Sequence, residues 1–306
     1  MRYVNGTRRL HVWAIAFILI FSAAVAAAVE EEKKSDAHAQ TAAADQAKFA
    51  GTDQCKICHE DQARMMQGTP HYRIFGTDSK AGAEGCENCH GAGLAHIEGG
   101  GDRSKISRLG GVKPSDASAV CMGCHKDRAD HAHFNRSVHA RAGVSCVDCH
   151  RVHRAKSDPL LSEKDPYLCY TCHQDVKGDF NKPFHHRVEE GLVKCTDCHN
   201  VHGGTTEKQL RTTKNQDRVC YQCHADKRGP FVYEHEPVRS EGCSSCHTPH
   251  GSSNAHMLSR STTNAVCLEC HSGIPSGPHP QNTARQSCTL CHARIHGSNG
   301  SSYLFK

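Results

Sequence analysis

The chain has 306 residues, and 37 Lys and Arg against 32 Asp and Glu give it a formal charge of only +5. So small a charge, with no nucleic-acid-binding motif beside it, argues against a nucleic-acid partner. Nine Phe, seven Tyr and one Trp are too few for the usual core of a domain this long, whereas 20 Cys and 26 His are abundant.

The N-terminal residues 1–28 are predicted to be a cleaved secretory signal peptide. Three arginines precede a 14-residue apolar run at 12–25, and small residues follow up to Ala28. No other apolar run approaches 18 residues, so we expect no direct lipid span in the mature chain. The charged, Ala-rich stretch 29–50 is predicted to be a flexible linker. Because the first cysteine is Cys55, a lipoprotein is not expected, and the expected compartment is the periplasm.

Ten copies of Cys-x-x-Cys-His run through the predicted cytochrome domain at 51–306 and use every cysteine. A shuffled chain of this composition would contain about 0.1 such motif. The motif is the attachment signature of haem c, in which two thiols form thioethers to the porphyrin edge and the next histidine binds the iron. Structural zinc sites and thioredoxin-like dithiols need no histidine directly after the second cysteine. We therefore predict a multihaem cytochrome c with ten haem c groups.

The motifs define the predicted attachment residues. The thioether cysteines are Cys55, Cys58, Cys86, Cys89, Cys121, Cys124, Cys146, Cys149, Cys169, Cys172, Cys195, Cys198, Cys220, Cys223, Cys243, Cys246, Cys267, Cys270, Cys288 and Cys291. The proximal iron ligands are His59, His90, His125, His150, His173, His199, His224, His247, His271 and His292.

The remaining histidines follow a repeat of five two-haem modules, in each of which one histidine lies between the two motifs and another trails the second motif by three to six residues. The modules are 55–96, 121–153, 169–202, 220–250 and 267–296. The predicted distal ligands are His71, His96, His139, His153, His186, His202, His235, His250, His279 and His296. A histidine three residues beyond a proximal ligand cannot easily reach the opposite face of the same iron, so we expect it to serve a neighbouring haem.

Some alternatives remain open at this point. His185 could replace its neighbour His186 as a ligand. Three further histidines are predicted bystanders, namely His131, His133 and His256. Methionine can also bind haem iron, and Met65, Met66 or Met257 could do so, but the histidines in phase are already sufficient.

The predicted fold is a multihaem cytochrome c made mostly of loops and short α-helices, with almost no β-sheet. The motif segments are expected to form one or two helical turns, and Gly- and Pro-bearing spacers such as 227–230 are expected to be loops. Alternating apolar runs are nearly absent. We expect an elongated chain whose core is supplied largely by porphyrins.

From Gly51 to Ser298 the chain resembles the periplasmic decahaem cytochromes of the MtrA/DmsE family. The resemblance is most specific in the motif region 220–230, in Tyr233-Glu234-His235-Glu236-Pro237 and in Arg294-Ile295-His296-Gly297-Ser298. It implies bis-histidine haems in an extended chain that lies inside an outer-membrane β-barrel porin. It also implies electron exchange with periplasmic and extracellular cytochromes, and association with the outer membrane.

These observations predict an electron carrier with no catalytic residues. The expected function is to relay electrons between the periplasm and the cell exterior during anaerobic or metal respiration. A soluble periplasmic shuttle would use the same residues and remains an alternative. A multihaem oxyanion reductase would need an open iron position, often with a motif ending in Lys, and no such variant is present. A cell-surface terminal reductase is disfavoured because no lipid-attachment cysteine is found.

Overall fold

The computed structural model describes residues 48–75, 85–154, 159–206, 208–211, 218–272, 279 and 286–306. The predicted signal peptide and all but the last three residues of the predicted linker lie outside them. The chain divides into two compact units, one ending at Arg108 and one beginning at Leu109. The first predicted module falls in the first unit, and the other four fall in the second.

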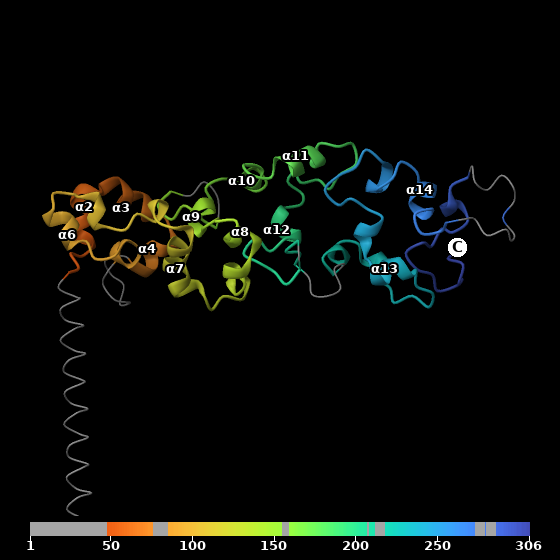
Figure 1. Ribbon diagram of the computed structural model, residues 1–306, viewed down its shortest axis with the longest axis horizontal. Helices are drawn as coiled ribbons and strands as arrows, with labels where there is room; N and C mark the ends of the chain where they lie inside the picture. The colour runs from red at the N-terminus through yellow and green to blue at the C-terminus, as the bar shows by residue number, and fades with distance from the viewer. Residues whose placement is uncertain are drawn as a thin grey trace, which may run out of the picture. The chain divides into compact units, whose positions relative to one another are not determined.

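The first unit is a group of short helices joined by loops and turns (Figure 1). They are α2 (Thr52–Cys58), α3 (Glu60–Met66), α4 (Pro70–Phe75), α5 (Glu87–His90), α6 (Leu94–Glu98) and the 3-10 turn η1 (Arg103–Lys105). The buried carboxylate of Glu87 joins three segments, because it accepts hydrogen bonds from the backbone N–H groups of Ala50, Gly51 and Gly93 at 2.7–2.9 Å. Such bonds satisfy backbone donors that no regular element pairs.

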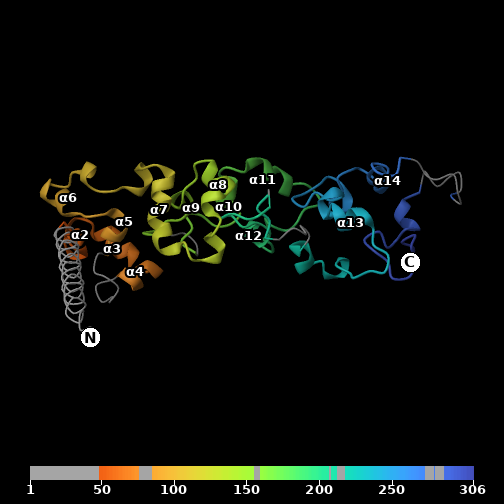
Figure 2. The same ribbon diagram turned by 60° about the horizontal axis from the view of Figure 1, so that its bottom comes forward.

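The second unit alternates short α-helices with 3-10 turns. Its α-helices are α7 (Pro114–His125), α8 (Val138–Arg141), α9 (Cys146–Cys149), α10 (Tyr167–Tyr170), α11 (Gln174–Phe180), α12 (Cys195–Cys198), α13 (Glu236–Ser240) and α14 (Thr263–Cys267). Its 3-10 turns are η2 (Leu109–Gly111), η3 (Ala129–His131), η4 (Phe134–Arg136), η6 (Cys220–Gln222), η7 (Ala225–Lys227), η8 (Cys243–Ser245), η9 (Ala255–Met257) and η11 (Cys288–Leu290). Within this unit α7 contacts α9, and α13 and α14 lie toward its C-terminal part (Figure 2).

Local sequence explains where these helices begin. Pro114 opens α7, where its missing N–H costs no hydrogen bond. Ser137 caps α8, since its hydroxyl accepts from the Ala140 N–H at 3.0 Å. At α9 the carboxylate of Asp148, inside the haem motif, accepts the Ser145 N–H at 2.7 Å. Capping residues therefore fix short helical turns that are too brief to be stable alone.

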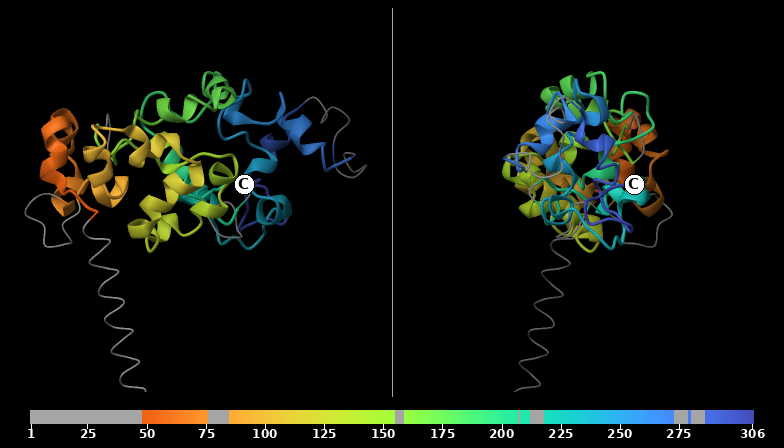
Figure 3. Two further views of the ribbon diagram at one scale, coloured as in Figure 1. Left: turned by 60° about the vertical axis from the view of Figure 1, so that its left-hand side comes forward. Right: turned by 90° about the vertical axis from the view of Figure 1, so that its right-hand side faces the viewer.

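No strand occurs among the described residues, and their ribbons show only helices and loops (Figure 3). Isolated antiparallel bridges replace sheets. Three of them repeat, each between the histidine of a second motif and a leucine downstream: His150 with Leu161, His199 with Leu210 and His247 with Leu258. The prediction of short helices and loops with almost no sheet is confirmed.

The protein core in the described residues is small. Across the described ranges only seven hydrophobic side chains are buried, and no large side chain there is fully buried. One cluster forms where Tyr170, Phe180 and Val188 meet. No helix within the described ranges is long and apolar enough to cross a membrane.

Candidate haem sites

Each Cys-x-x-Cys-His motif is shaped by one helical turn. In nine motifs the histidine N–H donates to the carbonyl of the first cysteine, four residues earlier, at 2.9–3.1 Å. The tenth, from Cys121 to His125, lies inside α7. Residues three and four apart lie on the same side of a helical turn. The turn therefore directs both thiols and the imidazole to one side, as attachment to one porphyrin requires.

A short polar side chain joins the two motifs of a module. It lies three or four residues before the first motif and accepts the backbone N–H of the first cysteine of the second motif. The four pairs are Thr52 with Cys86, Ser118 with Cys146, Asp165 with Cys195 and Asn264 with Cys288, at 3.1–3.4 Å. Two motifs whose first cysteines are 21 to 31 residues apart in the chain are thereby held side by side.

The first cysteines of the two motifs lie close together in four modules. In the third module the Sγ atoms of Cys169 and Cys195 and a carboxylate oxygen of Asp165 lie within 4.8 Å of one another. A hydrogen bond from Cys121 lowers the pKa of Cys146 to about 6. In the first and last modules, burial together with the neighbouring cysteine raises a thiol pKa to about 11, at Cys55 beside Cys86 and at Cys267 beside Cys288.

Successive modules are also neighbours through cysteines. The thiol pKa of Cys149 is raised by burial, by Asp148 and by Cys169 and Cys172 of the next module. That of Cys198 is raised by burial and by Cys220 of the module after. Cys246 likewise contributes to the raised thiol pKa of Cys267 in the last module. Within the second unit, adjacent motifs therefore follow one another in chain order.

Eight histidine pairs face each other across a common gap. In every pair one ring belongs to a motif and the other is a predicted distal ligand, and the ring centroids are 6.0–6.4 Å apart. The pairs are His59–His96, His150–His202, His173–His139, His199–His250, His224–His186, His247–His296, His271–His235 and His292–His279. The remaining predicted ligands are His71, His90, His125 and His153.

This gap fits one metal ion. With a metal–nitrogen bond of about 2.0 Å and about 1.2 Å from that nitrogen to the ring centroid, two imidazoles on opposite sides of one iron have centroids about 6.3 Å apart. The residues present therefore fit a six-coordinate haem with two axial histidines.

One ring of each pair is anchored to the backbone through Nδ1. In the second motif of each module the motif histidine is anchored, and its Nδ1–H donates to a carbonyl at 2.6–2.9 Å. The acceptors are Ser107 for His90, Pro159 for His150, Lys208 for His199, His256 for His247 and Tyr303 for His292. With Nδ1 as donor, Nε2 carries the lone pair that a metal needs.

For first motifs the distal histidine is anchored instead. His96 donates to Asp102, His139 to Val201 and His186 to Pro249, at 2.6–3.0 Å. His235 bonds to the backbone of Ile295. Burial lowers the pKa of several paired rings, among them His150, His250 and His296, and lowers that of His202 to about 4. The neutral imidazole thus favoured is the metal-binding form.

The pairing links one module to the next. In the second unit a histidine between two motifs faces the first motif of the following module, as His139 faces His173. A trailing histidine faces the second motif of the preceding module, as His202 faces His150. At the ends the pairs stay within one module, as in His59–His96 and His279–His292.

The structure distinguishes some of the histidines that the sequence left open. His186 faces His224, whereas His185 donates from Nδ1 to the Lys182 carbonyl and lies 3.4 Å from Glu190. His256 supplies only a backbone carbonyl, to His247.

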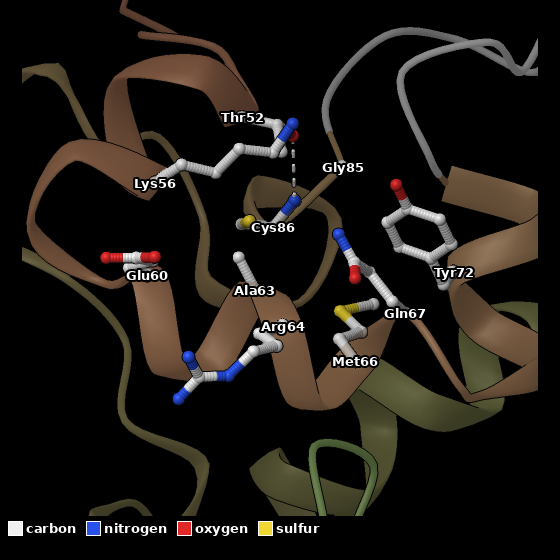
Figure 4. Close-up of a pocket in the computed structure, with 10 residues that line it drawn as sticks. All are labelled: Thr52, Lys56, Glu60, Ala63, Arg64, Met66, Gln67, Tyr72, Gly85 and Cys86. Atoms are coloured by element: carbon white, nitrogen blue, oxygen red, sulfur yellow. Dashed lines mark hydrogen bonds between the residues drawn. The ribbon is translucent and has the colours of Figure 1, made fainter.

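In the first unit Met66 lines a hollow beside Cys86 and Tyr72, where the Cys86 N–H donates to the Thr52 hydroxyl (Figure 4).

Comparisons with known proteins agree with this architecture. A family model described as the doubled CXXCH motif matches residues 139–178, 185–229 and 235–275. The multihaem cytochrome MtrA of Shewanella baltica (strain OS185) is 37% identical to the chain over 271 residues, which cover 81% of this chain and 79% of that protein. The chain belongs to the MtrA family of multihaem cytochromes. The resemblance found in the sequence is thereby confirmed.

As a member of the MtrA family, the protein is a c-type cytochrome that binds haem covalently and carries electrons. Each doubled-motif match covers the second motif of one predicted module and the first motif of the next. The family repeat is therefore offset by one motif from the modules defined above. The offset unit has a physical basis, because each match contains a facing pair. Two matches begin at the predicted distal histidine itself, as with His139 and His173 in 139–178, and the third begins one residue before His186.

Proposed function

We propose that this MtrA-family cytochrome binds ten haem c groups, one at each motif, and holds every iron between two histidines. The observation that carries the proposal is the common gap of 6.0–6.4 Å in eight ring pairs, which suits two axial ligands on one iron. Two more pairs of ligands are needed for ten haems. We assign to them the four predicted ligands outside the eight facing pairs, namely the motif histidines His90 and His125 and the distal histidines His71 and His153.

Bound haem supplies a one-electron Fe(III)/Fe(II) couple. The protein's part is to attach each group by two cysteines, to occupy both axial positions and to bring the groups into series. Thioether sulfurs sit at the porphyrin edge, so neighbouring cysteines from two motifs imply neighbouring porphyrin edges. If two histidines held each iron, no position would be open for a substrate, which supports an electron carrier over an oxyanion reductase.

We further propose that the protein relays electrons between the periplasm and the cell exterior, inside an outer-membrane β-barrel porin and in contact with periplasmic and extracellular cytochromes. Three points support this role: the predicted signal peptide at 1–28, the family membership and the neighbouring cysteines that join most successive motifs in the second unit. A β-barrel porin would place an insulating sheath around such a succession of haems within the membrane.

The ligand proposal predicts two classes of low-spin signal in electron paramagnetic resonance (EPR) of the oxidised protein. The angle between the two axial imidazole planes governs the g values of low-spin ferric haem. The planes lie at 7–19° in four pairs and at 63–70° in two, His139–His173 and His186–His224. We expect rhombic signals together with signals of large maximum g, and ten haems by pyridine haemochrome. A stoichiometric high-spin signal would contradict full histidine ligation.

The conduit proposal is tested in phospholipid vesicles loaded with reduced methyl viologen. The complex is purified from membranes of cells that express the tagged full chain, reconstituted, and exposed to external ferricyanide. We expect a β-barrel protein to co-purify and the internal dye to be oxidised, one electron for each ferricyanide reduced. Vesicles with the barrel alone are the control. A chain that purifies without a barrel and does not support dye oxidation would instead be a soluble shuttle.

A further inference from the structure

His131 occupies a position between two predicted haem sites, although it belongs to none of the eight facing pairs. It ends η3, just after the first motif of the second module. Its ring centroid lies 4.4 Å from that of His202, with the planes at 89°. It also lies 5.7 Å from the ring of His125, at 70°. One imidazole therefore touches a predicted distal ligand and a predicted proximal ligand of two different haems.

The position of His131 is fixed from its own side by a hydrogen bond. Its Nδ1–H donates to the carbonyl oxygen of His125 at 3.3 Å, so the ring is tied to the turn that carries the neighbouring motif. A carbonyl can only accept, which defines Nδ1 as the protonated nitrogen. The residue is half-buried. Its backbone is fixed as well, because the His131 N–H donates to the Arg128 carbonyl oxygen at 2.9 Å.

The loop that carries His202 is held against the same segment. The side-chain N–H of Asn200 donates to the Asp130 carbonyl at 3.4 Å, and the His139 Nδ1–H donates to the Val201 carbonyl at 3.0 Å. A Cβ atom at Gly203 would lie 2.7 Å from the His133 carbonyl oxygen. The backbone on both sides of His202 is thus held close to residues 130–139, and the His131 ring lies edge to face with the His202 ring.

In the next repeat a phenylalanine takes the place that His131 has beside the trailing histidine. There the trailing histidine His250 is contacted by Phe180, with centroids 5.3 Å apart and planes at 47°. The facing pair His199–His250 has its planes at 45°, whereas His150–His202 has them at 18°. The contact made by His131 is both closer and more nearly perpendicular than that made by Phe180.

We propose that His131 is a positioning residue that holds the imidazole plane of His202 nearly parallel to that of His150. Edge-to-face packing of two rings restricts rotation of the contacted ring about its Cβ–Cγ bond. The orientation of an axial imidazole affects the electronic state of the iron, as do other contacts outside the ligand set. The inference rests on the proposed role of His150 and His202 as axial ligands of one haem.

The test compares EPR spectra of four oxidised full-length variants with that of the parent, as difference spectra. His131→Ala removes the contact, and we expect one haem to leave the near-parallel class and give a broader signal at larger maximum g. His131→Phe keeps a ring, and we expect a smaller shift in the same direction. Phe180→His should change the EPR signal of a different haem, the one assigned to His199 and His250. His133→Ala is the matched control, because His133 contacts Arg136 and no facing pair.

The outcomes separate this inference from the ligand assignment. His202→Met is prepared in parallel, with haem content and thermal unfolding measured for every variant. If His202→Met alters the low-spin spectrum but His131→Ala and His131→Phe leave it superimposable on the parent, the positioning role is overturned while ligation by His202 stands. If His202→Met also changes nothing, the ligand assignment itself fails. Equal changes in His131→Ala and His133→Ala would mean a general disturbance and would overturn the inference.

Discussion

The haem-free chain is expected to lack stable tertiary structure. The described residues bury only seven hydrophobic side chains, and burial of apolar surface is the main favourable term that offsets the entropy lost when a chain is ordered. Apolar spacer residues inside the motifs are exposed, with Ile57 at 74% and Leu290 at 69%. Attached porphyrins would cover such residues and provide the missing apolar surface.

The measurement compares the mature chain produced with and without the cytochrome c maturation machinery. We expect the haem-free form to show little helical circular dichroism, no cooperative thermal transition and full exchange of backbone amides within the dead time. A reductant is required throughout, because thiols such as Cys169 and Cys195 lie close enough to oxidise together. A cooperative melt of the haem-free chain would show that the polypeptide core suffices.

The sequence was most informative where the chemistry needs contiguous residues. Covalent attachment requires two cysteines and a histidine on one helical turn, so the motif itself predicts the turns observed at Cys146–Cys149 and Cys195–Cys198. Short helices without sheets also followed from the lack of alternating apolar runs. Family membership could be recognised because the same spacing recurs ten times.

The pairing of histidines could not be read from the chain. The motif spacing predicts ten distal candidates, but His202 and His150 belong to different modules and are brought together only by folding. The backbone anchors were equally hidden, because a carbonyl such as that of Pro249 carries no sequence signal for its bond to His186. The sequence predicts His131 to be a bystander, since nothing in its spacing indicates the contact with His202.

Replacing Gly251 by alanine is expected to disturb two haem sites at once. A Cβ atom at this position would overlap the carbonyl oxygen of Asp179. Because the obstacle is backbone, no side-chain rotation can relieve the overlap, and the two segments must separate. Overpacking of this kind costs about 1–3 kcal/mol or more. Gly251 is adjacent to His250, and the neighbouring Pro249 carbonyl anchors His186, so both proposed distal ligands should be displaced.

The separation would also break the paired backbone bonds between Phe184 and Ser252, at 2.8 and 3.1 Å. We expect Gly251→Ala to lower the thermal midpoint and to convert the haems of His199 and His224 partly to high-spin, visible by magnetic circular dichroism. Gly178→Ala is the matched control, because it lies beside Asp179 in α11 with no atom near its Cβ position. Alanine inside a helix should stabilise by about 0.5–1 kcal/mol, so the two variants should shift the midpoint in opposite directions. If Gly251→Ala keeps the parent midpoint and a fully low-spin spectrum, close packing of the two segments is not what holds these ligands in place.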